Sequence, residues 1–201
     1  MIIVKQIVSI EWDMFASVNE GKARASCQED RATFHAMRAA QFSAWSGKAA
    51  ESYLRDLEDA RRGGRNLVEE KYIHMMKTTD PTLYGLLLSR VIPPSDAALA
   101  LALEVSAMLL EQMSALFDEY PYVSSHGRPL YSASYSEVVS VETYQLGELL
   151  TYSETTLAAL KEHIAALEKD GVSLSRIILE NTVKHYGYRS LESAEQSRAR
   201  Q

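Results

Sequence analysis

The chain has 201 residues, of which 46% are hydrophobic and 24% charged, a composition typical of a folded globular protein. Acidic residues outnumber basic residues by 27 to 21, and the net charge of −6 disfavours a general attraction to nucleic acid or to an anionic membrane. One cysteine cannot form an internal disulfide, and the apolar N-terminus lacks a basic region and a small-residue cleavage site, so we expect a soluble cytoplasmic protein.

Apolar residues recur at steps of three and four along nearly the whole chain, which is typical of helices. Ser, Asn, Gly and Pro residues divide this pattern into segments. The expected helices cover roughly residues 2–18, 26–45, 47–62, 67–79, 83–91, 95–117, 137–150, 153–169 and 173–187. No segment favours a strand, so the sequence predicts an all-α fold, a single multi-helix bundle over residues 1–201.

Two segments differ from the rest. Residues 95–117 are rich in Ala and Leu and apolar around most of the helix circumference, so we expect a long central helix that is buried on several sides. Its most apolar part, residues 97–110, contains Glu104 and is too short to span a bilayer. Residues 118–136 are irregular and rich in Tyr, Ser and Pro, as in a linker or a loop that covers a site.

An internal repeat is suggested when residues 41–75 are compared with residues 148–182. Ser46 then matches Ser153 before a helix, and Gly64 matches Gly171 after it. A duplication would give two related helical halves around the long helix. Chance similarity between apolar helix faces is the alternative.

The common motifs for nucleotide, metal and disulfide-exchange sites are missing from the sequence, including GxxxxGK[ST], GxGxxG, HExxH and CxxC. Glu70 and His74 lie one helical turn apart and could share a metal, but an exposed pair on a helix face is the better interpretation. We therefore predict no metal site and no cofactor.

Residues 21–30, GKARASCQED, contain the single cysteine. Ser26 followed three residues later by Glu29 is typical of a capping box, so we expect Ser26 to be the N-cap of the second helix. The backbone amides of Cys27 and Gln28 would then lack partners, and the helix dipole would favour an anion and lower the pKa of the thiol.

Charged residues flank this predicted helix start. Arg24 could hold a carboxylate or phosphate with two hydrogen bonds, and Asp30 is placed to orient Arg24 or Arg38. The alternative is a buried, inert cysteine among ion pairs that only support the fold.

Several polar residues interrupt apolar helix faces elsewhere. Glu11, Arg38 and Glu148 each lie among apolar neighbours, and buried carboxylates need partners. Any one ion pair among them could be purely structural, but together they would outline a polar cavity. Tyr144 and Tyr152 could donate hydrogen bonds or act as acids in that cavity.

The stretches IEWDMFASVNE, ARASCQED and SVETYQLGELLTYSETTL resemble a bacterial family of unknown function that carries E-W-x-M-F and R-A-S-C-Q motifs. The similarity extends over nearly the whole chain, and Asn19 is one of the matching positions. That family usually has Gly-Gly before the arginine, whereas Lys22 and Ala23 follow Gly21 here. The resemblance implies a self-contained helical domain and implies no activity.

Three functional hypotheses remain. In the first, a small helical enzyme acts on a small anionic or amino-acid-like metabolite, with catalysis by Cys27, Glu11, Glu148 and Tyr152. Its substrate-binding residues would be Arg24, Ser26, Gln28, Asn19, Asp30, Arg38 and Tyr144. In the second, a non-catalytic protein binds a small ligand or a partner, and its outer apolar stripes form a homodimer. In the third, Cys27 alone makes a redox-responsive regulator.

Overall fold

Helices form nearly all of the regular structure in the computed structural model, which describes residues 2–18, 29–132 and 138–200. Within these ranges there is no strand, which confirms the predicted all-α multi-helix bundle. The helices are α1 Ile2–Ser17, α2 Arg31–Phe42, α3 Gly47–Arg62, α4 Leu67–Thr79, α5 Pro81–Leu87, the 3₁₀ helix η2 Leu88–Arg90, α6 Asp96–Glu119, α7 Pro121–Ser125, α8 Val141–Leu149, α9 Glu154–Lys169, α10 Leu174–His185 and α11 Leu191–Arg198.

Side-chain caps fix many of the helix starts. The Ser46 hydroxyl accepts a hydrogen bond from the backbone N–H three residues later, at 3.2 Å, and Ser153 does the same. Asn66 caps α4 in the same way, at 3.0 Å. Each side chain satisfies a backbone donor that the first helical turn leaves unpaired, which is why the sequence predicts these starts well.

The start of α2 differs from its predicted position. The helix begins at Arg31, and the carboxylate of Asp30 is its N-cap, accepting from the Thr33 N–H at 3.0 Å. The prediction that Ser26 caps this helix is therefore wrong, since Asp is as good a capping residue as Ser. Ser26 itself lies outside the described residues.

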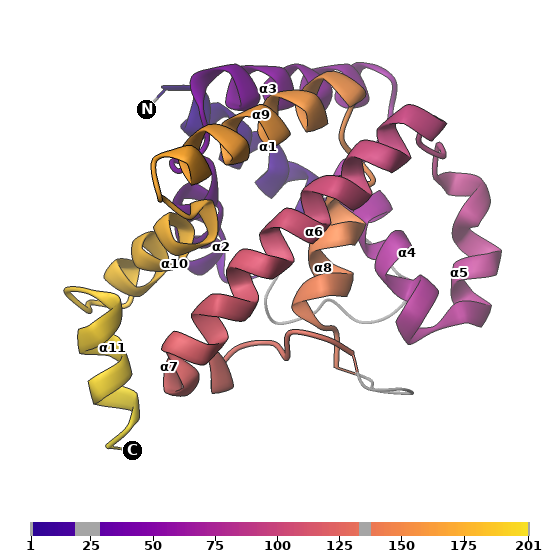
Figure 1. Cartoon of the computed structure of the whole chain (residues 1–201). Coiled ribbons are helices and arrows are strands. Elements are labelled where there is room, and N and C mark those ends of the chain that lie inside the picture. The colour runs from indigo at the N-terminus through magenta and orange to yellow at the C-terminus, as the bar shows by residue number, and fades with distance from the viewer. Residues whose placement is uncertain (1, 19–28, 133–137, 201) are drawn as a thin grey trace.

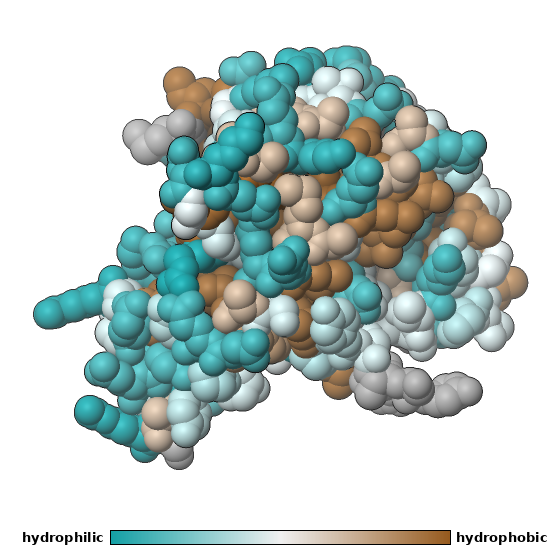
Figure 2. Space-filling view, viewed as in Figure 1, coloured by the Kyte–Doolittle hydropathy of each residue, from teal (hydrophilic) through white to brown (hydrophobic). Residues whose placement is uncertain are grey.

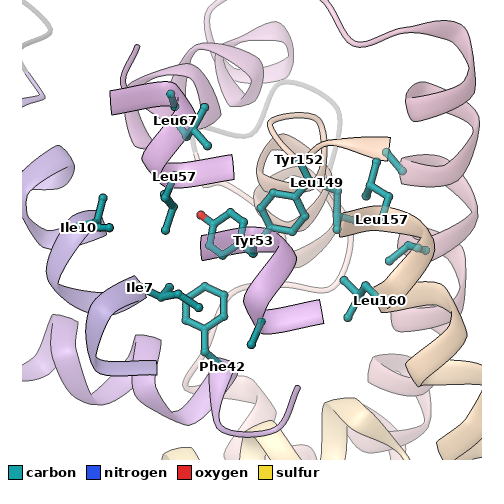
Figure 3. Close-up of a cluster of buried hydrophobic side chains, with 14 of the residues drawn as sticks. Ile7, Ile10, Phe42, Tyr53, Leu57, Leu67, Leu149, Tyr152, Leu157 and Leu160 are labelled. Carbon is teal, nitrogen blue, oxygen red and sulfur yellow. The ribbon is translucent and has the colours of Figure 1, made fainter. Parts of the chain in front are cut away.

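The helices pack as two groups that contact each other at several points. α1 packs against α2, α3 and α4, and α6 packs against α8, α9 and α10. The groups meet where α3 lies beside α9, where α4 packs on α8 and where α10 packs on α2 (Figure 1). One apolar core runs through both groups, with Tyr53 and Tyr152 near its centre (Figure 3).

The long helix α6 buries one face only. Ala102 and Val105 are fully buried, whereas Leu103 on another side of the helix is 50% exposed. The prediction of burial on several sides is therefore wrong, and Figure 2 shows apolar residues on the surface over α6. By length and composition α6 is the one described helix that could cross a bilayer, and its buried face packs against α8, α9 and α10.

The segment predicted as an irregular loop includes the short helix α7. The Glu195 carboxylate on α11 accepts hydrogen bonds from the backbone N–H groups of Tyr122 and Val123, at 2.9 and 2.7 Å. A second, smaller apolar cluster that includes Leu116 and Leu191 lies beneath this contact. The first part of the segment is thus anchored to the C-terminal helix.

Candidate functional site

Arg38 on α2 lies at the centre of a buried network of charged residues. Its Nε and Nη2 atoms donate to the two carboxylate oxygens of Glu11, each at 2.6 Å. Nη1 and Nη2 donate to Glu148 at 3.1 and 2.9 Å, and Nη1 also donates to Gln41 at 2.9 Å. These contacts use every N–H that a guanidinium carries.

Glu148 on α8 is the main acceptor of this network. Besides the two bonds from Arg38, it accepts from the Gln41 amide at 2.9 Å, from the Tyr152 hydroxyl at 2.5 Å and from Lys71 Nζ at 2.5 Å. Helices from both packing groups therefore meet at one carboxylate.

Glu11 on α1 is held in a similar way. Its Oε1 accepts from the Tyr53 hydroxyl at 2.7 Å in addition to its bonds from Arg38. Both oxygens of this carboxylate have partners, and the residue is only 1% exposed.

The network balances its own charge. Glu11 and Glu148 carry two negative charges, Arg38 and Lys71 two positive charges, and none of the four is more than 8% exposed. Burial alone would lower the pKa of Arg38, but the two carboxylates hold this pKa well above its ordinary value. Burial alone would raise the pKa of Glu148, but Arg38 and Lys71 hold it well below its usual range.

The two tyrosines of the network act as donors. Burial, with the Glu11 carboxylate nearby, raises the pKa of Tyr53 well above its ordinary value. Burial, with the Glu148 carboxylate nearby, does the same for Tyr152. Both phenols therefore stay protonated at neutral pH and stabilise the carboxylates through hydrogen bonds.

A glycine allows α8 to approach α4 closely at this point. A Cβ atom on Gly147 would lie 2.9 Å from the Met75 Cγ and 3.1 Å from the backbone oxygen of Lys71. Real Cβ atoms rarely come so close, so any larger residue would push the helices apart. Gly147 thus lets Glu148, its neighbour in sequence, reach the Lys71 ammonium group.

A cavity of about 520 Å³ opens beside the network, between α2, α6, α8, α9 and α10. Its walls are mostly apolar, and its size is that of a typical small-molecule site. Gln41, Tyr144, Glu148 and Tyr152 belong both to the cavity wall and to the network or its immediate surroundings. The apolar part of the wall includes Leu109, Met113, Leu160, Leu174, Ile178 and Leu179.

Two polar atoms of this wall bond no other described residue. The Ser175 side chain is 5% exposed, and its backbone N–H donates to Gln112, but its hydroxyl has no partner in the described ranges. The Gln145 amide nitrogen donates to Ser106, which leaves the amide oxygen available. Neither atom is fully shielded from the cavity, so both can form a hydrogen bond with a molecule that enters it.

Arg128 stands at the edge of the same cavity. Its guanidinium lies 4.7 Å from the centroid of the Tyr144 ring and donates one hydrogen bond, to the backbone oxygen of Val139. The Tyr144 ring also receives Lys71, whose Nζ lies 3.5 Å from its centroid. Tyr144 therefore contacts both the buried cation and the cation at the rim.

The structure brings together part of the predicted site. Glu11, Arg38, Glu148 and Tyr152 share one network, with Tyr144 against it. Asp30 lies apart, because it caps α2 instead of orienting Arg38. Cys27, Arg24, Ser26, Gln28 and Asn19 lie outside the described residues.

Several residues of the candidate site are absent from the sequence-based prediction. The predicted site residues include none of Tyr53, Lys71, Gln145 and Ser175. Lys71 lies one turn from Leu67 and Met75 on the buried face of α4, and this signal could have identified it. The sequence pattern around Arg128 does not point to a site, because its place at the cavity rim depends on the path of the chain between α7 and α8.

Glu70 was also misjudged. It is 4% exposed and forms two hydrogen bonds with Arg65, at 2.9 and 2.6 Å. The interpretation of Glu70 and His74 as an exposed pair is therefore wrong, since His74 is also half-buried. Within the described ranges no group of three or more His, Cys, Asp or Glu residues could hold a metal ion.

Residues 1–196 match the family model described as "Protein of unknown function (DUF4125)". The chain belongs to this family. The DUF4125 match spans every residue of the buried network and the cavity wall, so the site lies within the family domain. No curated protein and no solved structure matches the chain closely enough to support a comparison.

Proposed function

We propose that this protein binds a small, mainly apolar organic molecule in the cavity beside Glu148, and that it acts as a non-catalytic ligand-binding protein. The observation that carries the proposal is a cavity of about 520 Å³ whose wall holds the Ser175 hydroxyl, which bonds no other described residue. Protein interiors are normally close-packed, so a space of this size next to the core favours an occupant.

The apolar wall indicates the character of that occupant. Side chains from α6 and α10 would contact its body, and burial of apolar surface would supply most of the binding free energy. The Gln145 oxygen and the Ser175 hydroxyl would fix its orientation, as the few polar groups of small-molecule sites usually do.

The charged network supports binding better than it supports catalysis. Every carboxylate oxygen of Glu11 and Glu148 already accepts hydrogen bonds from protein donors, so neither is available to take a proton from a ligand. The network instead provides a rigid polar wall that holds Gln41 and Tyr152 in place. A protein with such a wall would serve as a sensor or a carrier.

The enzymatic hypothesis stays a prediction. It depends on Cys27 and Arg24, which lie outside the described residues, and on an anionic or amino-acid-like substrate. The expected cytoplasmic location and the homodimer are likewise predictions.

Titration with 8-anilinonaphthalene-1-sulfonate, a fluorescent anion with apolar aromatic rings, tests the proposal. Ile178 is a partly buried residue of the cavity wall, so Ile178→Trp should fill the space and abolish saturable probe binding while the far-ultraviolet circular dichroism stays unchanged. Val172→Trp is the matched control, because Val172 is 38% exposed and should tolerate the same side chain. A wild-type protein without saturable binding, or an Ile178→Trp variant that binds as well as wild type, would refute the proposal.

A further inference from the structure

The two packing groups have the same internal layout. α3 and α9 have the same length and begin 107 positions apart, as do the starts of α4 and α10, and this is also the separation of Gln41 and Glu148. Gly64 and Gly171 follow the first pair of helices with the same positive φ of 71°. The backbone N–H after each glycine then closes an equivalent turn, at 2.8 and 2.9 Å.

The first helix of each group fits the same scheme. α1 has three helix partners in its group, and α6 has the three equivalent partners in the other. Arg38 on α2 donates to Glu11 on α1, while Gln145, at the equivalent position of α8, donates to Ser106 on α6. Both groups thus have a polar contact at this position, an ion pair between α1 and α2 in the first group and a neutral hydrogen bond between α6 and α8 in the second.

This equivalence relates the large cavity to a much smaller one. On the other side of Glu148 lies a space of only about 20 Å³, and most of the residues around it have a counterpart 107 positions away in the wall of the large cavity. Three such pairs are Phe34 and Val141, Lys71 and Ile178, and Tyr72 and Leu179. Phe34 and Tyr72 of the first group are thus replaced by smaller aliphatic side chains in the second.

Aromatic rings fill the space in the first group. Phe34 stacks on Phe15 with ring centroids 4.9 Å apart, and Tyr72 stacks on Phe15 at 6.3 Å. Val141 and Leu179 cannot fill the equivalent volume in the second group, and that volume is the large cavity.

The charges differ in the same way. The two carboxylates that receive cations beside the small space, Glu11 and Glu148, have neutral counterparts, Ser106 and Gln41, in the surroundings of the large cavity. The large cavity therefore offers no unpaired carboxylate to a cationic ligand. Arg128 at its rim keeps several N–H donors that bond no other described residue, and these suit an anion.

We infer that the chain is an internal duplication whose second half keeps open, for an amphipathic organic acid, the space that aromatic side chains fill in the first half. The inference rests on the proposed function and adds to it the class of ligand and its orientation. The apolar body lies between α6 and α10, and the terminal anionic group lies at Arg128.

The first arm of the test restores the side chains of the first half. The double variant Val141→Phe, Leu179→Tyr should raise the midpoint of thermal unfolding and weaken binding of decanoate, measured by isothermal titration calorimetry, by more than about tenfold. The control Val172→Phe, Leu99→Tyr makes the same changes at exposed positions and should bind as wild type does. Undiminished binding by the folded double variant would overturn the equivalence of the two spaces.

The second arm tests the anionic group and does not depend on core repacking. Arg128 is exposed, so the Arg128→Gln variant should fold normally. Its affinity for decanoate should fall by about tenfold, and its affinity for decanol should stay unchanged. The control Arg55→Gln, at another exposed arginine, should change the affinity for neither decanoate nor decanol. If wild type binds decanoate and decanol with equal affinity, the inference that the ligand is an organic acid is wrong, while the proposed function stands. If wild type binds neither decanoate nor decanol, the result counts against the proposed function itself.

Discussion

The Arg38 guanidinium on α2 and the Glu148 carboxylate on α8 form two hydrogen bonds, of 2.9 and 3.1 Å, between residues 110 positions apart. The bonds join the two packing groups at a point where neither side chain is exposed by more than 10%. Burial of such a pair costs desolvation free energy, and only the complete set of partners offsets this cost.

Removal of the central cation should be strongly destabilising. Arg38→Met leaves two buried carboxylates with Lys71 as their only cation, and loss of one partner of a buried pair typically costs about 3–5 kcal/mol. Urea unfolding followed by circular dichroism measures the change. Lys48→Met removes a pair whose side chains are 68% and 66% exposed and should have little effect. Equal unfolding midpoints for the two variants would show that the network does not stabilise the fold.

The tyrosine hydroxyls should each contribute measurably. Tyr53→Phe and Tyr152→Phe each remove one donor to a buried carboxylate, and a hydrogen bond to a charged group is typically worth about 1.5–3 kcal/mol. Tyr122→Phe, at a position that is 51% exposed, serves as the control in the same urea experiment. If the two buried variants unfold like the control, the assigned donor roles are incorrect.

The close approach of α4 and α8 predicts that replacing a helical glycine with alanine, which usually stabilises a helix, lowers the stability of this protein. Gly147→Ala should destabilise the protein, because overpacking typically costs about 1–3 kcal/mol and exceeds the gain in helix propensity of about 1 kcal/mol. Gly85→Ala in α5 has free space around the new methyl group and should be neutral or stabilising. A stabilised Gly147→Ala variant would contradict the described helix contact.

Glu148 should make the stability of the protein depend on acidic pH. Its pKa in the folded state is well below the ordinary value of 4.5, so the unfolded chain takes up protons first as the pH falls. The stabilisation is present above this ordinary value and is lost as the pH falls through the folded-state pKa. Unfolding free energies measured across this range should fall with acidification in wild type and fall less steeply in Glu148→Gln. Parallel pH profiles for the two proteins would exclude Glu148 as the source.

Local signals in the sequence predicted most helices because the residues that set helix ends act within one turn. Ser46, Ser95 and Ser153 each cap the helix that follows them. The start of α2 was mispredicted because Ser26 and Asp30 are both good capping residues, and local sequence does not decide between two such competitors.

The network could be predicted only in part. Polar residues on apolar faces pointed to Glu11, Arg38 and Glu148, since buried charges must find partners. Lys71 and Tyr53 escaped notice because their partners depend on which helices cross, and periodicity within one helix carries no such information. The cavity could not be predicted for a related reason, since its volume depends on how the side chains of five helices pack against one another.

Trp45 offers the most direct test of the central claim, that the cavity is a ligand site. The chain has two tryptophans, and Trp45 lines the cavity while Trp12 lies in the aromatic cluster of the first half. In a Trp12→Phe variant, titration with decanoate should produce a saturable change in the emission of Trp45, with the same dissociation constant as calorimetry gives. Calorimetric binding without any change in Trp45 emission would place the ligand elsewhere and contradict the account.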